Sequence, residues 1–243
     1  MLYALSRKSV AIFRELTESK ALLAFDFDGT LAPIVDDPAR ARMRPSTRRL
    51  LGRLASTYPC VVISGRSRAD LRDRLTGTGI RRTIGNHGAE PWEGAAALRD
   101  LIAQWNAVLA KELLPLHGVR IENKQFSVTV HYRQSPSKTR AHAQILKAAR
   151  SLPGARLICG KQAVSIVSED APNKGTALRA EMDRRRCDRT LYVGDDETDE
   201  DVFALDEGLH LLTIRVGQSR TSRAAYFIRN QGQIDKLLRV LLS

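Results

Sequence analysis

The stretch ALLAFDFDGT, residues 21–30, is a short apolar run that ends in two aspartates one residue apart. A short apolar run of this kind is typical of a strand in a parallel sheet that is covered on both faces. Residues i and i+2 share one side of a strand, so the carboxylates of Asp26 and Asp28 should converge where the strand ends. Two such anions repel each other unless a cation or a shared proton lies between them. The stretch therefore predicts a buried strand with a chemically demanding site at its carboxyl end.

Similar apolar runs recur along the chain and alternate with amphipathic stretches of helical length. This alternation predicts a parallel sheet with helices on both faces, a doubly wound, Rossmann-like α/β core formed by residues 1–91 and 173–243. The expected strands cover residues 21–29, 60–66, 190–196 and 210–217, and the expected helices cover residues 46–57, 174–186 and 199–207.

The middle of the chain, residues 92–172, follows a different order. Its pattern predicts helix, two strands, helix and two strands, over residues 96–115, 119–133, 137–152 and 155–168. Within the first strand pair, Val128 and Val130 alternate with Thr129 and His131, which predicts one buried and one polar face. An αββαββ block between the two halves of an α/β core indicates an inserted α+β cap domain.

The amino-acid composition limits which kinds of binding partner the protein can have. The 39 Lys and Arg residues exceed the 27 Asp and Glu residues and give a formal charge of +12. However, only 5% of the residues are aromatic, and the basic clusters lack the interleaved aromatic side chains that stack on bases. We therefore expect the charge to attract small anionic substrates rather than nucleic acid.

The chain also lacks the usual signals for membranes and for secretion. No segment approaches the about 20 consecutive apolar residues that a transmembrane helix needs. Residues 1–16 show helical spacing rather than a signal peptide. Cys60, Cys159 and Cys187 are far apart and have no metal-binding spacing. We expect a soluble, cytoplasmic monomer with reduced cysteines and an N-terminal helix.

Three further stretches place polar residues where ligands bind in open α/β sheets, at strand ends and helix starts. Ser64 ends an apolar strand and is followed by a glycine, which suits a phosphate oxygen. Lys174 lies at a predicted helix start, where its charge and free backbone amides favour an anion. A third predicted strand ends in an acidic group that offers hard oxygen ligands for Mg²⁺: Asp195, Asp196 and Asp199.

Each of these features has a plainer explanation by itself. Asp26 and Asp28 can form a strand-ending turn, although the spacing excludes an EF-hand calcium loop. Ser64 can be an ordinary turn residue, Lys174 a surface lysine, and the acidic group a helix N-terminus favoured by the macrodipole. Taken together and in this order, they predict a nucleophilic aspartate, an acid/base aspartate and a magnesium ion around a phosphate.

These four motifs resemble those of the haloacid dehalogenase superfamily of phosphotransferases. Within it, the chain resembles the trehalose-6-phosphate phosphatases, with matching signatures FDFDGTLAPI, VISGR, GNHGAE, ENKQFSVTVHYR and GDDETDEDVF. The resemblance covers both halves of the core and part of the cap. It implies hydrolysis of trehalose 6-phosphate to trehalose and phosphate.

The resemblance also implies a role for each motif residue. Asp26 would be the nucleophile and form an aspartyl-phosphate, and Asp28 would be the general acid and base. Ser64 and Lys174 would stabilise the charge of the transferred phosphoryl group. The implied Mg²⁺ ligands are Asp26, the backbone carbonyl of Asp28, and Asp195, with Asp196 and Asp199 close behind.

Further residues are implied to bind the substrate. His131 among them can instead be an ordinary sheet histidine with a satisfied partner. The implied substrate-binding residues are Gly65, Arg66, Asn86, His87, Glu90, Glu122, Lys124, His131, Arg133 and Lys161.

One position departs from the family pattern. The family's cap carries a glutamate in a Gly-Lys-x-x-x-Glu-x-Arg-Pro run, whereas this chain has Ser165 at that place. This departure affects which sugar phosphate is expected as substrate, and it does not affect the expected phosphoryl-transfer chemistry. It leaves open a phosphatase with the same cap type that acts on sucrose phosphate, mannosylphosphoglycerate or a hexose phosphate.

Overall fold

The fold is that of a computed structural model, which describes residues 1–17, 19–91, 94–160, 162–205 and 210–243. The chain divides into two compact units. The first unit joins Met1–Gly88 to Asn173–Ser243, and the second is the continuous segment Ala89–Pro172. Each unit has its own hydrophobic core.

The first unit is built on a parallel sheet with the strand order β1-β11-β10-β9-β2-β3-β4. The predicted strand at residues 21–29 is β2, which lies between β9 and β3 at the middle of the sheet. All five of its residues are buried. The strands are β1 (Leu2–Tyr3), β2 (Ala21–Phe25), β3 (Cys60–Ile63), β4 (Arg82–Ile84), β9 (Arg189–Gly194), β10 (Leu211–Val216) and β11 (Tyr226–Ile228).

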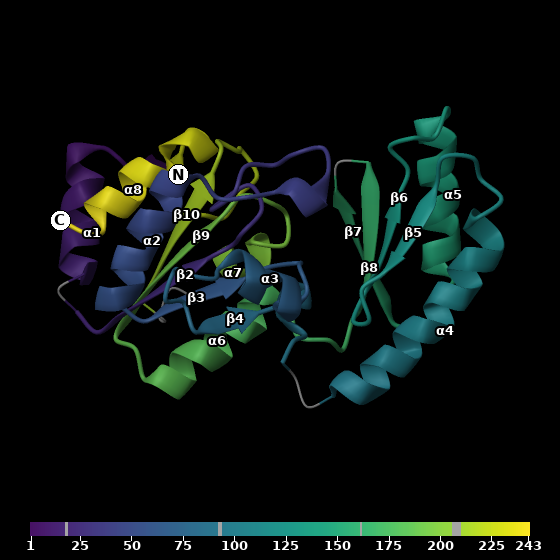
Figure 1. The fold of residues 1–243 in the computed structure, drawn as a ribbon, viewed down its shortest axis with the longest axis horizontal. Coiled ribbons are helices and arrows are strands. Elements are labelled where there is room, and N and C mark those ends of the chain that lie inside the picture. The colour runs from purple at the N-terminus through teal and green to yellow at the C-terminus, as the bar shows by residue number, and fades with distance from the viewer. Residues whose placement is uncertain (18, 92–93, 161, 206–209) are drawn as a thin grey trace. The chain divides into compact units, whose positions relative to one another are not determined.

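Helices cover both faces of this sheet (Figure 1). Because side chains alternate along β2, Leu23 and Phe25 pack with α1, α2 and α8, whereas Leu22 and Ala24 pack with α6 and α7. The predicted doubly wound α/β fold is thereby confirmed. The helices are α1 (Arg7–Thr17), α2 (Pro45–Thr57), α3 (Arg68–Arg74), α6 (Lys174–Arg185), α7 (Glu200–Phe203) and α8 (Ile234–Val240), with short 3₁₀ turns at Pro38–Arg40, Asn86–Gly88 and Gln231–Gln233.

The N-terminus differs from the prediction of a helix over residues 1–16. Leu2–Tyr3 forms the edge strand β1 beside β11, and helix α1 begins only at Arg7. The backbone N–H of Leu2 donates to the carbonyl of Ala225 at 2.8 Å. This pairing joins residues more than 200 positions apart, so local helical spacing could not reveal it.

The second unit has the predicted order of helix, two strands, helix and two strands. Its strands form an antiparallel sheet in the order β5-β6-β8-β7. The elements are α4 (Ala95–Leu113), β5 (Arg120–Asn123), β6 (Val128–His131), α5 (Lys138–Arg150), β7 (Ala155–Gly160) and β8 (Ala163–Ser168). The predicted αββαββ order of the inserted α+β domain is thereby confirmed, and its sheet is antiparallel.

The two faces of the cap sheet differ in chemistry. Val128 and Val130 are fully buried in the core that the sheet shares with α4 and α5. Thr129 alternates with them and lies directly opposite Glu122 on β5 and Ser165 on β8. The face that carries Thr129 is therefore the polar one. Among the described residues, no helix combines the length and the hydrophobicity that are needed to cross a bilayer.

Candidate active site

The loop after β2 turns back sharply. The N–H of Asp26 still donates to the carbonyl of Val193 on β9, at 2.8 Å, and so continues the sheet. The chain then reverses at Gly29, whose φ of 81° is a conformation that favours glycine. A hydrogen bond of 2.8 Å from the N–H of Gly29 to the carbonyl of Ala32 closes the turn. Asp26 and Asp28 thus follow β2 at the carboxyl end of the sheet.

Two glycines allow the acidic segments of neighbouring strands to approach each other. A Cβ atom at Gly29 would overlap the carboxylate of Asp195, which follows β9. A Cβ atom at Gly194 would overlap the carboxylate of Asp199. Both positions therefore need a residue without a side chain, and the glycines let the carboxylates pack against backbone.

Lys174 links the two acidic segments. It is the first residue of α6, whose start is fixed by a capping box between Asn173 and Thr176. Its side chain is 1% exposed, and its Nζ donates to Asp26 Oδ1 at 3.0 Å and to Asp199 Oδ1 at 2.8 Å. Although burial opposes it, the charges of Asp196, Asp199 and Asp26 raise the pKa of Lys174 well above its usual 10.5. The ammonium group is therefore held charged among the carboxylates.

Asp199 accepts four hydrogen bonds. Its Oδ1 receives the ammonium of Lys174 and the hydroxyl of Tyr192, the latter at 2.6 Å. Its Oδ2 receives the backbone N–H groups of Asp195 and Asp196 at 2.8 and 3.0 Å. Four donors use the lone pairs of both oxygens, so this carboxylate is locked in one orientation.

Tyr192 is a member of the site that sequence reasoning missed. Its side chain is fully buried on β9, and its hydroxyl needs a partner there. The available signal was a tyrosine within the apolar strand TLYVG, two residues before Gly194.

The carboxylates are crowded, and their pKa values show it. Burial, followed by repulsion from Asp199 and Asp196, raises the pKa of Asp195 to about 8. Burial also raises the pKa of Asp26 well above its usual value, although Lys174 opposes the shift. At Asp196 desolvation acts in the same direction, but Lys174 and a hydrogen bond from Thr198 prevail and lower the pKa. Two of the three acids therefore favour a proton or a cation.

The donor set fits a divalent metal ion. Carboxylate oxygens of Asp26, Asp195 and Asp199 lie within 4.8 Å of one another. Mg²⁺ takes hard oxygen ligands and usually binds one or two carboxylates while it keeps several waters. Since Asp199 is saturated with hydrogen bonds, Asp26 and Asp195 are the carboxylates with oxygens to offer.

Arg66 lies on Asp28 in this structure. Its Nε and Nη2 donate to the two carboxylate oxygens of Asp28 at 2.6 and 2.7 Å, which is a bidentate pair. The same guanidinium donates to Asp70 at 2.7 Å and to the carbonyl of Pro38 at 2.8 Å. The sequence predicted Arg66 as a substrate-binding residue and gave no sign of this contact.

Four other predicted residues gather at the ends of β3 and β4. Ser64 and Gly65 follow β3, and Asn86 and His87 follow β4. The N–H of His87 donates to the carbonyl of Ser64 at 3.0 Å, and a Cβ atom at Gly65 would overlap the imidazole. The motifs VISGR and GNHGAE are therefore in direct contact.

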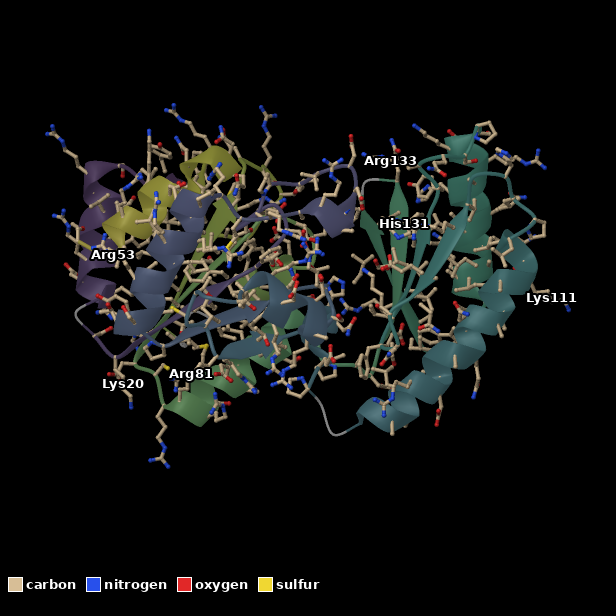
Figure 2. All side chains as sticks on the ribbon, viewed as in Figure 1. Lys20, Arg53, Arg81, Lys111, His131 and Arg133 are labelled. Atoms are coloured by element: carbon tan, nitrogen blue, oxygen red, sulfur yellow. The ribbon has the colours of Figure 1, made fainter. Side chains whose placement is uncertain are left out.

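In the cap, two predicted residues form a pair. Glu122 Oε2 lies 2.8 Å from His131 Nε2, and this hydrogen bond is the main cause that lowers the pKa of Glu122. Ser165 shares a hydrogen bond of 3.1 Å between hydroxyls with Thr129. His131 ends β6 and Arg133 follows it in the next turn, and both are labelled in Figure 2.

Three more predicted substrate-binding residues lie within or beside the second unit. Lys124 is half-buried in the turn between β5 and β6, where its N–H donates to the carbonyl of Ser127 at 2.9 Å. Glu90 is half-buried and Arg133 is exposed. Lys161 lies outside the described residues.

The chain is similar in sequence to a known family of proteins. Residues 24–227 match the family described as trehalose-phosphatase. Trehalose-phosphate phosphatase of Mycobacterium ulcerans is 34% identical over 203 residues, which are 77% of this chain and 52% of that protein. The Mycobacterium avium protein of the same name is 35% identical over 194 residues, 74% of this chain and 49% of that protein. This chain therefore spans about half the length of the curated relatives that it matches.

A solved structure shares the fold. The C-terminal domain of trehalose-6-phosphate phosphatase from Candida albicans has a TM-score of 0.81 and is 24% identical. The match covers 99% of this chain and 98% of the other. At this identity the likeness concerns the fold, which is that of the haloacid dehalogenase phosphatases.

Proposed function

Because the chain belongs to the trehalose-phosphatase family, we propose that it hydrolyses trehalose 6-phosphate to trehalose and inorganic phosphate. The observation that carries the proposal is the buried lysine that bridges two strand ends, with Lys174 Nζ at 3.0 Å from Asp26 and 2.8 Å from Asp199. A phosphoryl group that reaches Asp26 there meets a fixed positive charge, which stabilises the charge that develops during transfer.

Asp26 is the nucleophile in this proposal. One of its oxygens attacks phosphorus, so that a bond to Asp26 forms while the bond from phosphorus to the sugar oxygen breaks. Asp28 gives its proton to the departing sugar oxygen and later takes a proton from the water that hydrolyses the aspartyl-phosphate. In the structure both oxygens of Asp28 accept from Arg66, so Asp28 is ionised there, and one oxygen must be released from Arg66 before it can carry the proton. Ser64 donates to the phosphoryl oxygens.

We propose that Mg²⁺ is held by the carboxylates of Asp26 and Asp195 and by the backbone carbonyl of Asp28. Asp199 supports this set from behind because its own oxygens are saturated, and Asp196 lies beside it. When bound, the ion neutralises charge on the phosphoryl oxygens and relieves the repulsion between the acids.

We propose that the polar face of the cap sheet binds the sugar part of the substrate. Glu122 and His131 come from β5 and β6, and Lys124 comes from the turn between these strands. The retained Gly-Lys pair of the family sequence adds Lys161 to the proposal. Core residues Asn86 and His87 belong to the same family signature. The cytoplasm remains the proposed compartment, because Cys60, Cys159 and Cys187 carry free thiols.

The test is phosphate release from trehalose 6-phosphate, sucrose 6-phosphate and glucose 6-phosphate, with Mg²⁺ or with excess EDTA. We expect trehalose 6-phosphate to be the best substrate and chelation to abolish turnover. Undiminished hydrolysis in EDTA would contradict the metal, and a preference for another ester would move the assignment to that sugar.

A second experiment separates the two aspartates. Asp26→Asn should form no phosphoenzyme in acid-quenched reactions, whereas Asp28→Asn should bind substrate but turn over several orders of magnitude more slowly. Asp73→Asn, at an exposed position of α3, is the matched control and should keep wild-type rates. Substantial turnover by Asp26→Asn would overturn the assignment of the nucleophile.

A further inference from the structure

The core unit has a hollow at the amino-terminal ends of β3 and β4, whereas the acidic cluster lies at the carboxyl ends of β2 and β9. It has a volume of about 520 Å³, within the range of small-molecule pockets. Its walls come from the end of α2, the starts of β3 and β4, and the last turn of α6. The lining residues are Gly52, Ala55, Ser56, Thr57, Tyr58, Pro59, Cys60, Gly79, Ile80, Arg81, Arg82 and Arg185.

A buried glutamate, Glu181, binds two of the arginines that line this hollow. The Glu181 side chain has no exposed surface and accepts from Arg82 Nε at 2.9 Å and from Arg185 Nε at 2.6 Å. Arg184 binds the same carboxylate at 2.6 Å. Arg82 and Arg185 line the hollow, and within the described chain their guanidinium groups make no hydrogen bond other than those to Glu181. Both therefore keep N–H donors for a ligand while the glutamate fixes their orientation.

The lining is strongly positive. Arg81, another lining residue, is exposed and adds a third guanidinium, and the described residues that line the hollow include no aspartate or glutamate. Glu181 neutralises one charge, so the remaining arginines repel one another. Crowding like charges costs free energy, which a bound dianion would recover.

We propose that this hollow is a second ligand site, separate from the catalytic one, that binds the dianionic phosphate group of a small molecule. Arginine is suited to this role because its planar fork donates two parallel hydrogen bonds to a phosphate. The hollow offers binding and no chemistry: burial raises the pKa of its one thiol, Cys60, to about 12, so that the thiol stays protonated.

The test is an amide NMR titration of the whole protein with inorganic phosphate, in EDTA and at constant ionic strength set with potassium chloride. The proposal predicts saturable shifts at residues 56–60 and 79–82, with a dissociation constant that differs from that of shifts at residues 26–30. Arg81→Ala and Arg185→Ala should each weaken binding at the first set at least fivefold. Neither variant should change the affinity reported by residues 26–30.

Arg53→Ala is the matched control. Arg53 is also exposed, but it does not line the hollow, and it lies apart from Arg81 (Figure 2). It should leave both sets of shifts unchanged. The titration is then repeated with trehalose 6-phosphate, on the Asp26→Asn variant, and with adenosine monophosphate. The compound with the lower dissociation constant at residues 56–60 and 79–82 indicates which class of phosphate ester the hollow binds. Absence of saturable shifts at residues 56–60 and 79–82, or equal affinity in Arg81→Ala and Arg53→Ala, overturns the proposal.

Discussion

Asp199 occupies a position that a free carboxylate could not hold. It is fully buried among other acids, and burial would drive it to take up a proton. The four donors around it offset part of this effect, two from backbone N–H groups and two from Lys174 and Tyr192, and the net pKa of Asp199 stays raised. Because the same carboxylate holds Lys174 toward Asp26, its orientation controls where the positive charge of the site lies.

The first prediction concerns Tyr192→Phe. The change removes one donor from Asp199 but leaves the ring and its packing, so Asp199 and Lys174 should lose their fixed orientation. We expect kcat to fall about tenfold, equivalent to about 1.4 kcal/mol, with KM changed less than twofold. Steady-state kinetics with trehalose 6-phosphate and saturating Mg²⁺ measure both constants.

The control for this prediction is Tyr226→Phe. Tyr226 is also buried in the core sheet, where its ring packs edge-on against Phe13 at 5.1 Å, and it lies on β11, outside the acidic cluster. Its loss of a hydroxyl should leave kcat unchanged. Equal kinetics for both variants would show that Tyr192 supports only the fold.

Parts of the site that depend on local sequence could be predicted, and parts that depend on tertiary contacts could not. Spacing within ALLAFDFDGT places Asp26 and Asp28 at the end of a strand, because the two-residue period of a strand is local. The contact from Arg66 to Asp28 and the bond from Tyr192 to Asp199 are different. Both depend on which loops the tertiary fold brings together, and no local pattern encodes that choice.

At the scale of elements, the polar face of the cap sheet is set by strand register. Glu122, Thr129 and Ser165 lie in one cross-strand row, so a side chain at position 165 points to the same side as Glu122. In the structure the hydroxyls of Ser165 and Thr129 bind each other at 3.1 Å. The position where the family carries glutamate thus retains a hydrogen bond but has no charge.

The second prediction is that Ser165→Glu raises kcat/KM for trehalose 6-phosphate about tenfold, or about 1.4 kcal/mol. A carboxylate at this place can accept hydrogen bonds from sugar hydroxyls, and such charge-assisted bonds are stronger than those of serine. Hydrolysis of glucose 6-phosphate should change little. Ser165→Ala, which removes the hydroxyl without adding charge, should stay within about threefold of wild type.

The outcome distinguishes two substrates. A fall in activity toward trehalose 6-phosphate in Ser165→Glu, together with a wild-type preference for another ester, would mean that Ser165 belongs to a different sugar specificity.

Helix α6 carries Lys174 at its start and Glu181 near its end, so its stability bears on the site. Glu181 is buried beneath Arg82, Arg184 and Arg185. Although desolvation opposes it, the hydrogen bonds from Arg184 and Arg185 lower the pKa of Glu181 below its usual 4.5. A lowered folded-state pKa contributes stability above about pH 4.5 that is lost as the pH falls through the folded value.

The third prediction is that Glu181→Gln lowers the free energy of unfolding by about 2–3 kcal/mol at pH 7, because an amide cannot neutralise the guanidinium groups. The deficit relative to wild type should shrink as the pH falls below 4.5, because the unfolded wild-type chain then takes up a proton on Glu181, and it should vanish below the folded-state pKa. Urea unfolding between pH 3 and pH 7 measures it. Glu15→Gln, at an exposed position of α1, should show no deficit, and a deficit independent of pH would exclude the charge mechanism.

At the scale of the whole molecule, the chain forms two compact units, each with its own buried side chains. The alternation of apolar runs and amphipathic helices is local, so it predicted the doubly wound sheet and the order of the cap elements. The order of strands in the sheet and the edge pairing of β1 with β11 are not local. They depend on contacts between the first and last parts of the chain, which periodicity does not report.

The second unit is continuous in sequence and has a core of its own. Trp105 on α4 is 2% exposed and packs with Val128, Ile145 and Ile166, which are fully buried. A helix pair over one face of a four-stranded sheet satisfies the conditions under which a small domain can fold alone.

The last prediction follows from this autonomy. Residues 89–172 expressed alone should fold, with a near-ultraviolet circular dichroism signal from packed aromatic rings and a single cooperative transition in urea. Trp105→Ala in that segment should lower the free energy of unfolding by about 3–5 kcal/mol, because it leaves a large cavity in a small core. The exposed Val108→Ala on the same helix should cost far less, since its side chain fills no cavity. A segment with far-ultraviolet helix signal but no cooperative transition would mean that the cap depends on the core for its packing, because secondary structure alone does not require a fixed interior.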